Sequence, residues 1–145
     1  RSRICGRYRA LNLSGFHVAQ MWEHSRFRDP YLRDDMQDFG ILTDTLECAV
    51  RWSQVELVHQ QVRAFVKSRP RTICTCHISH AYPQGCNLYF IFIAKIDSIN
   101  EYLDLQYGIL EAIQQSGAAI SHHHGIGKQT GPWFAEQQEI ISMGL

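Results

Sequence analysis

The alternation of apolar and polar residues along the chain predicts strands and helices in a defined order. Residues 41–50 alternate with a period of two, which is typical of a strand with one buried face. Residues 53–67 and 98–115 repeat apolar positions at helical spacing. Two further strands are expected at 72–79 and 88–94. Because the link between them has turn chemistry, they should pair as an antiparallel hairpin.

The segment after the second of these helices completes the order. Gly117 suits a left-handed helix end, and residues 118–121 are expected to form a short fourth strand. The order β-α-β-β-α-β predicts an α+β, ferredoxin-like fold, with an antiparallel sheet and the helices packed on one face. Ser53 is a suitable N-cap for the first helix. A last helix is expected to open at Pro132, where the missing N–H of proline costs nothing.

The region before the first strand reads as two helical pieces. Residues 14–38 carry a rough apolar stripe, and Pro30 should divide it because proline removes a hydrogen-bond donor and clashes with the preceding turn. We expect residues 1–145 to form a single domain that is a fragment of a longer protein. Residues 1–13 are expected to be a flexible N-terminal segment.

Composition narrows the class of protein. The chain has 14 Lys and Arg and 14 Asp and Glu, so its formal charge is zero, which argues against a nucleic-acid partner. No apolar run reaches the roughly 18 residues of a transmembrane segment. The odd count of five cysteines, without a secretion signal, favours reduced thiols and a cytoplasmic location.

Two groups of residues raise the question of a metal site. Cys74, Cys76 and His80 have even spacing and would share one strand face, where buried core thiols are favoured over a thiolate metal site. His122 and His124 could converge on a metal while the histidine between them points away. The loop lacks the acidic residue that would complete such a site. We therefore expect no metal.

The segment SHHHGIGK, at residues 121–128, carries the most specific chemistry. Each neutral imidazole offers one donor and one acceptor, and its charge changes near neutral pH. Three adjacent histidines therefore favour a wet cavity, an ion site or proton transfer over burial in a core. The glycines match neither a Walker A loop nor a dinucleotide fingerprint. Gly125 and Gly127 instead permit unusual torsions, or a close approach of the backbone to a flat or bulky group.

Arg33 and Tyr82 each allow two interpretations. Arg33 lies in a segment where charge alternates with aromatic bulk, so it belongs either to a solvated helix surface or to a pocket. The planar fork of arginine binds carboxylate or phosphate through two parallel hydrogen bonds. Tyr82 follows a strand and is either a packing residue of the hairpin corner or a positioned proton donor. A purely structural role for the histidines also stays open.

Three blocks of sequence carry a family resemblance. They read FRDPYLRDDMQDFGILTDTLECAVRWS at 27–53, CHISHAYPQGCNLYF at 76–90 and SHHHGIGKQTGPW at 121–133. Together they resemble the C-terminal substrate, or cap, domain of FAD-linked oxidases of the vanillyl-alcohol oxidase type. Within that group they are most similar to the alkyldihydroxyacetonephosphate synthase (alkylglycerone-phosphate synthase) branch. The likeness extends over residues 15–145.

The resemblance implies a role for each matching residue. Arg33 would lie near the reactive edge of the flavin, and Tyr82 would act on the substrate as acid or base. The catalytic residues are then Arg33, Tyr82, His122, His123 and His124. The cofactor-binding residues are Arg33, His123, Gly125 and Gly127, and the substrate-binding residues are Tyr82, His80 and Lys128.

The resemblance also implies an activity. The parent enzyme would exchange the acyl group of acyl-dihydroxyacetone phosphate for a fatty alcohol in ether lipid synthesis, using FAD without net redox change. FAD would be held mainly by an N-terminal FAD-binding domain of the same parent chain, so the fragment alone is expected to be inactive. Thr130 departs from the arginine or histidine common there in the family, which leaves the phosphate-bearing substrate open.

Two alternatives remain at this level. One is an FAD-dependent oxidase or dehydrogenase of a hydroxy acid or an alcohol. The other is a ferredoxin-like metal-binding module. A homodimer is left open, and in a eukaryote the location would be peroxisomal rather than cytoplasmic.

Overall fold

The computed structural model describes residues 7–8 and 17–143. The N-terminal segment 1–13, which was expected to be flexible, lies outside these residues apart from Arg7 and Tyr8. The chain divides into two compact units, residues 1–35 and 36–145. Each unit is described by itself.

The first unit contains helix α2 (Val18–Ser25) and the first turns of helix α3 (Asp29–Gln37). The predicted division near Pro30 is confirmed, because α3 begins one residue before that proline. Pro30 therefore occupies the first turn, where its missing N–H removes no helical hydrogen bond. None of the residues of α2 is buried within its unit.

The second unit is built on a three-stranded antiparallel sheet with the strand order β1-β3-β2. The strands are β1 (Ile41–Arg51), β2 (Thr72–Ala81) and β3 (Gly85–Lys95), and β3 lies in the middle. Each of them contains one of the predicted strands and extends it by one to four residues. The predicted hairpin of β2 and β3 is confirmed, and Tyr82 closes its turn by donating its N–H to the carbonyl of Gly85 at 2.8 Å.

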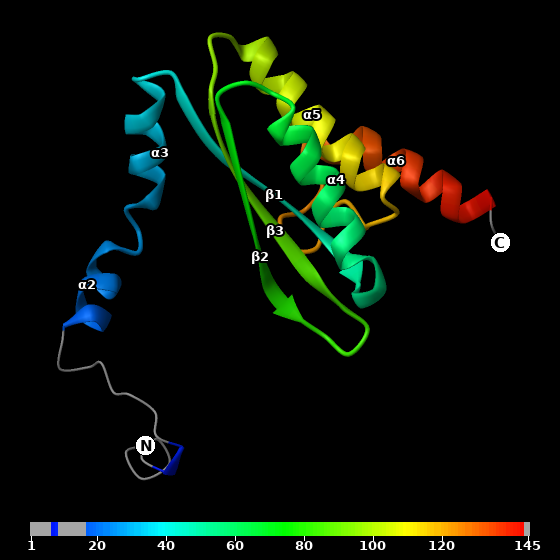
Figure 1. The fold of residues 1–145 in the computed structure, drawn as a ribbon, viewed down its shortest axis with the longest axis horizontal. Coiled ribbons are helices and arrows are strands. Elements are labelled where there is room, and N and C mark those ends of the chain that lie inside the picture. The colour runs from blue at the N-terminus through cyan, green and yellow to red at the C-terminus, as the bar shows by residue number, and fades with distance from the viewer. Residues whose placement is uncertain (1–6, 9–16, 144–145) are drawn as a thin grey trace. The chain divides into compact units, whose positions relative to one another are not determined.

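The helices cover one face of this sheet. After the 3₁₀ turn η2 (Trp52–Gln54) come α4 (Val55–Lys67), α5 (Ile99–Gln115) and α6 (Gly127–Met143). Figure 1 shows α4 and α5 on the same side of the sheet, with α6 beside α5. The α+β class, the antiparallel sheet and the one-sided packing of the helices are therefore as predicted. In the described residues, no helix combines the length and the apolar character needed to cross a membrane.

The predicted fourth strand is reduced to a single pair of residues. Ala119 forms an isolated antiparallel bridge with Ala49, at the outer edge of β1. The ladder does not continue, because the N–H groups of residues 122–124 donate to the side chain of Glu47 instead of to the backbone of β1. The predicted order of the first three strands and two helices is therefore correct, but the predicted fourth strand is a loop with one bridge to β1.

The helix starts were predicted with mixed success. Ser98 is the N-cap of α5, and its Oγ accepts a hydrogen bond from the N–H of Glu101 at 3.2 Å. The prediction that Ser53 caps α4 is wrong. Ser53 lies inside the 3₁₀ turn, and the N-cap is Gln54, whose side chain makes no capping bond.

The last helix also starts earlier than predicted. Helix α6 begins at Gly127, and Pro132 lies inside it rather than at its first position. The proline preference for a first turn was therefore a misleading signal. At the end of α5, Gly117 has a φ of 76°, which confirms the predicted left-handed helix end.

The core lies between the sheet and helices α4 and α5. The even-numbered residues of β1 and β3 point into it, as predicted for β1. A tight approach of α5 to α4 occurs at Gly108, because the ring of Phe65 fills the space that a side chain would take. The core includes Leu42, Cys48, Val50, Cys74, Cys86, Leu88, Phe90, Phe92 and Ala94 from the sheet, Val58, Val62, Val66, Leu105, Ile109 and Ile113 from the helices, and Ala118 and Ile120 from the segment after α5.

Candidate functional site

A β-bulge turns the end of β2 toward the face of the sheet that the helices leave open. The pairing of β2 with β3 shifts between Ile78 and His80, so that His80 lies opposite Asn87. Without the bulge, His80 would share the core face with Cys74, as the even spacing suggested. That prediction is wrong, because the extra residue rotates the strand end and places His80 on the open face.

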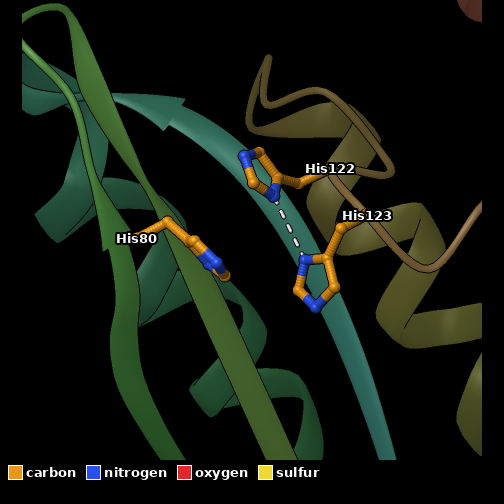
Figure 2. Close-up of side chains that lie close together, drawn as sticks. All are labelled: His80, His122 and His123. Atoms are coloured by element: carbon orange, nitrogen blue, oxygen red, sulfur yellow. Dashed lines mark hydrogen bonds between the residues drawn. The ribbon is translucent and has the colours of Figure 1, made fainter.

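The histidine loop meets this open face from the other edge of the sheet. The bridge at Ala119 sets the chain beside β1, and residues 121–124 then pass over Glu47. Figure 2 shows the ring of His80 projecting from β2 toward the rings of His122 and His123. Nitrogen atoms of these three rings lie within 4.8 Å of one another. Residues 42 positions apart in the sequence are thereby brought into one cluster.

Tyr82 joins the cluster through His122. Its hydroxyl lies 3.0 Å from Nε2 of His122, and Nδ1 of His122 lies 3.1 Å from Nδ1 of His123. The backbone of Tyr82 is fixed as well, since Nε1 of Trp52 donates to its carbonyl oxygen at 2.8 Å. The structure therefore brings Tyr82, His122 and His123 into one hydrogen-bonded chain, which we call the Tyr82–His123 chain.

Polar residues of the hairpin hold the other side of the cluster. Asn87 is fully buried, and its Nδ2 donates to Oγ of Ser79 at 2.7 Å. The same Oγ lies 2.9 Å from Nδ1 of His80, and Nδ2 of Asn87 lies 3.4 Å from Nδ1 of His123. Ser79 is thus the link between His80 and the sheet, a role that sequence analysis did not identify.

Glu47 is the most important residue that sequence analysis missed. Its side chain is buried beneath the histidine loop, with a relative exposure of 2% for the residue. Oε1 accepts the backbone N–H groups of His122, His123 and His124 at 2.7, 2.8 and 2.9 Å. Burial alone would raise the pKa of Glu47, but these hydrogen bonds to the charged form outweigh burial and lower it. The carboxylate is therefore ionised at neutral pH.

His124 is not one of the three histidines whose nitrogens converge, but its ring lies edge-on to that of His123, with 4.5 Å between the ring centroids. Its ring meets the ring of Tyr89 edge-on, with 5.2 Å between the ring centroids. The expectation that His122 and His124 would converge while His123 points away is wrong. The loop does not follow strand geometry, because three successive N–H groups turn toward one carboxylate oxygen.

The two glycines after the triplet adopt left-handed torsions. Gly125 has a φ of 82° and Gly127 a φ of 56°, which agrees with the expected need for unusual torsions. A Cβ atom at either position would meet no described atom within 4 Å. Lys128 is exposed in the first turn of α6. The roles of these three residues toward cofactor and substrate stay predictions.

Arg33 belongs to the first unit of the chain, in helix α3, and its side chain is exposed there. The Tyr82–His123 chain belongs to the second unit. The role of Arg33 beside the flavin therefore stays a prediction.

Cys74 and Cys76 face away from the histidine cluster. Cys74 is buried on the core side and Cys76 packs against the same core. Burial raises the pKa of the Cys74 thiol, and it raises that of Cys76 to about 11. His80 lies on the opposite face of the strand from both thiols. The arrangement rules out a metal site built from Cys74, Cys76 and His80.

A cavity opens beside the Tyr82–His123 chain. Its volume is about 560 Å³, which is in the range of small-molecule sites. Tyr82 and His122 line one side of it, and Arg51, Gln54 and Gln84 supply further polar groups. The nitrogens of His80, His122 and His123 are close enough to share a metal ion, and the same donors could instead face a cofactor or substrate.

Comparison with known proteins identifies the family of the chain. The family model of the C-terminal domain of FAD linked oxidases matches residues 14–141. Alkyldihydroxyacetonephosphate synthase of Dictyostelium discoideum is 32% identical over 129 residues, covering 83% of this chain and 21% of that protein. The synthase of Trypanosoma brucei brucei is 29% identical, covering 92% and 24%. The uncharacterized FAD-linked oxidoreductase YgcU of Escherichia coli K12 is 28% identical, covering 66% and 22%.

A solved structure of alkyldihydroxyacetonephosphate synthase has a similar fold. The TM-score is 0.60 at 24% sequence identity, covering 83% of this chain and 23% of that one. The chain thus spans between 21% and 24% of the length of the synthases it matches. The predicted family and its cofactor FAD are confirmed by these matches. This chain belongs to the family of FAD-linked oxidase C-terminal domains.

Proposed function

We propose that this chain is the substrate-facing domain of an FAD-dependent enzyme that exchanges the acyl group of acyl-dihydroxyacetone phosphate for a fatty alcohol. The Tyr82–His123 chain is the observation that carries the proposal, since it links a phenol to two imidazoles at the side of a cavity. The similarity to synthases from two organisms supports the choice of reaction. Cleavage of the bond from the substrate carbon to the acyl oxygen releases a fatty acid, and the alcohol oxygen bonds to that carbon.

The proposed task of the Tyr82–His123 chain is to move the proton that this exchange requires. The alcohol loses a proton as its oxygen bonds to carbon, and the departing carboxylate is stabilised by an O–H donor. The Tyr82 hydroxyl reaches His122 Nε2 at 3.0 Å, and His122 Nδ1 reaches His123 Nδ1 at 3.1 Å. Both distances are short enough for a proton to pass along the chain without a water molecule.

The residues on the open face fit FAD as the cofactor of this reaction. The ring of Tyr89 stacks on that of His123, so the exposed edge of the cluster is flat and aromatic and carries nitrogen donors and acceptors. Such a surface suits the planar flavin, and His123 and Tyr82 are the residues that would face it. When bound, FAD supplies the covalent and electron-transfer chemistry that side chains lack. We place most of the FAD contacts in the remainder of the parent chain.

An oxidase or dehydrogenase of a hydroxy acid or alcohol is the second candidate. The similarity to the E. coli FAD-linked oxidoreductase favours it, because the name of that protein assigns it redox chemistry. The same Tyr82–His123 chain would then remove the hydroxyl proton of the substrate. The cytoplasmic or peroxisomal location of the parent stays a prediction, as does a homodimer.

The test uses the full-length enzyme with FAD bound, a labelled fatty alcohol and acyl-dihydroxyacetone phosphate. We expect labelled ether lipid to form. The variant Tyr82→Phe removes only the hydroxyl and should lower kcat by about 100-fold or more. Tyr107→Phe is the matched control, because Tyr107 packs against Trp133 on the helix side of the sheet. It should keep the wild-type rate.

Two results would contradict the proposal. Near-normal turnover of Tyr82→Phe would remove the Tyr82–His123 chain from the mechanism. Absence of ether product, together with bleaching of the visible flavin absorption by a simple hydroxy acid in stopped flow, would favour the oxidase.

A further inference from the structure

The burial of Glu47 calls for an explanation beyond stability. A carboxylate is almost never fully buried unless it is paired, because its desolvation is costly. Glu47 has a relative exposure of 2% in the middle of strand β1, on the open face of the sheet. A Thr or Val would fill such a strand position without this cost. The carboxylate must therefore contribute something that an apolar residue cannot.

The two oxygens of Glu47 have different surroundings. Oε1 accepts three consecutive backbone N–H groups of the histidine triplet and the hydroxyl of Ser121 at 3.2 Å. Three convergent N–H groups form an anion-binding nest, in which a carboxylate fixes the backbone torsions. Oε1 thus holds the loop in the conformation that presents the histidine rings.

The other oxygen points at a ring nitrogen. Oε2 is buried and has no hydrogen bond in the described part of the chain, but Nδ1 of His123 lies 3.3 Å from it. Nδ1 of His122 is farther away, at 3.9 Å. An ionised carboxylate can only accept a hydrogen bond, so it favours a protonated Nδ1 on His123, whose single hydrogen lies between Oε2 and Nδ1 of His122. The amide nitrogen of Asn87 has two hydrogens and donates one of them to Ser79; its contact with Nδ1 of His123 is longer, at 3.4 Å, and carries no charge.

A proton on Nδ1 of His123 fixes the direction of the whole Tyr82–His123 chain. Two N–H groups cannot face each other at 3.1 Å, so Nδ1 of His122 must be bare and its proton must sit on Nε2. That Nε2–H then donates to the oxygen of Tyr82. The hydroxyl hydrogen of Tyr82 is left to point outward, toward the substrate.

We propose that Glu47 is the positioning residue of this site, with Oε1 holding the histidine loop and Oε2 selecting the tautomer of His123 that makes Tyr82 a proton donor. The inference concerns the same site as the proposed function and rests on it only for the effect on turnover. Glu47 reaches the reaction solely through His123 and His122.

The experiment compares Glu47→Gln with Glu47→Ala in the full-length enzyme. Gln keeps one carbonyl oxygen for the loop but replaces the second oxygen with an N–H donor, whereas Ala removes both. Asp44→Asn is the matched control, because Asp44 lies on the same strand but accepts hydrogen bonds from Tyr102 and Gln106 of α5. Any general effect of removing a strand carboxylate will appear in that control.

Hydrogen exchange tests the role of Oε1 without any substrate. In Glu47→Ala the amides of residues 122–124 should exchange about tenfold faster or more, since each loses its acceptor. Glu47→Gln should keep most of the wild-type protection, and Asp44→Asn all of it. Unchanged exchange in Glu47→Ala would overturn the role of Oε1.

Diethyl pyrocarbonate tests the role of Oε2, again without substrate, because it acylates only a bare imidazole nitrogen. In the wild type Nε2 of His123 is the bare and accessible one. In Glu47→Gln the side-chain N–H of the glutamine should donate to Nδ1 of His123, so that the proton of the imidazole moves to Nε2. Because Nε2 of His123 is then protonated, its modification rate should fall about tenfold. His59 of α4 serves as the internal reference. An unchanged rate at His123 would overturn the tautomer assignment.

Turnover then separates the two proposals. Glu47→Gln should lower kcat by about 100-fold while KM changes by less than about threefold, and the pH profile of kcat should shift. Normal kcat with normal loop protection would show that Glu47 is structural only. If the wild-type enzyme does not exchange acyl for alkyl groups, the proposed function fails, while hydrogen exchange and modification still decide the role of Glu47.

Discussion

The two faces of the sheet bury their residues by different means. On the helix side, Phe90 and Phe92 are fully buried by apolar packing against α4 and α5. On the open side, Glu47 and Asn87 are almost as inaccessible, but a hydrogen-bonded loop covers them. Successive residues of a strand thus alternate between the apolar layer on the helix side and the polar layer on the open side.

The difference separates stability from chemistry. Apolar burial contributes roughly 25 cal/mol per Å² and needs no particular partner. A buried polar group instead needs each hydrogen bond to be formed, and it is costly when one is lost. The helix side should therefore determine whether the chain folds, and the open side what the folded chain does. Substitutions on the two faces should reveal this division.

The largest expected effect on stability is that of Phe90→Ala. Phe90 is fully buried at the centre of the middle strand, so its loss should cost about 3–5 kcal/mol of unfolding free energy. Ile73→Ala is the matched change on the edge strand, where the side chain is 57% exposed, and should cost less than about 1 kcal/mol. Urea unfolding of the chain measures both. Equal losses would contradict the assignment of the core to the helix side.

A smaller effect is expected for Gly108→Ala in α5. The added methyl group would overlap the ring of Phe65, and the forced shift should destabilise the protein by about 1–3 kcal/mol. Gly131→Ala in α6 is the control, because its methyl group would meet no described atom within 4 Å. There the higher helix propensity of alanine should stabilise by up to about 1 kcal/mol. Thermal unfolding should show opposite signs, and the same sign for both would refute the packing argument.

On the open face, Glu47→Gln should alter how stability depends on pH. The hydrogen bonds of the loop hold the pKa of Glu47 below its ordinary value despite burial. A lowered carboxyl pKa adds stability that is complete above the unfolded-state pKa of about 4.3 and is lost as the pH falls through the folded-state pKa. The gap between wild type and variant should therefore shrink below about pH 4.3 in urea unfolding series. Parallel curves would argue against an ionised Glu47.

The smallest effect concerns the caps of the covering helices. Ser98→Ala removes the hydrogen bond to the N–H of Glu101 and should cost about 1 kcal/mol. Ser53→Ala should lower the unfolding free energy by only a few tenths of a kcal/mol, about the size of a surface substitution, because Ser53 does not cap α4. Chemical unfolding of the two variants distinguishes them. A larger loss of unfolding free energy for Ser53→Ala than for Ser98→Ala would support the prediction that Ser53 caps α4.

Periodicity accounts for most of what the sequence predicted about the fold. The alternation over residues 41–50 predicted a strand with one buried face, which is β1, and the helical repeats located α4 and α5. These signals are local, so a single chain contains them. The end of α5 was also predictable, because Gly117 meets a torsional need that few other residues can meet.

The remaining features depend on contacts between distant segments. Glu47 meets its partners 75 to 77 positions later in the chain, and an acidic residue in a strand pattern does not reveal this. The bulge at Ser79 has no sequence signature, so His80 was assigned to the wrong face. The histidine triplet was found because its composition is unusual, but its pairing with Glu47 required coordinates.

The bulge in β2 has an evolutionary consequence. A single-residue deletion at Ser79 would restore regular pairing with His80 still opposite Asn87, but it would remove the hydroxyl that bonds to both His80 and Asn87. One codon therefore separates a strand end that holds His80 through a hydroxyl from one that does not. Related chains that differ in length by one residue between Cys76 and Tyr82 should be expected to differ in chemistry before they differ in architecture.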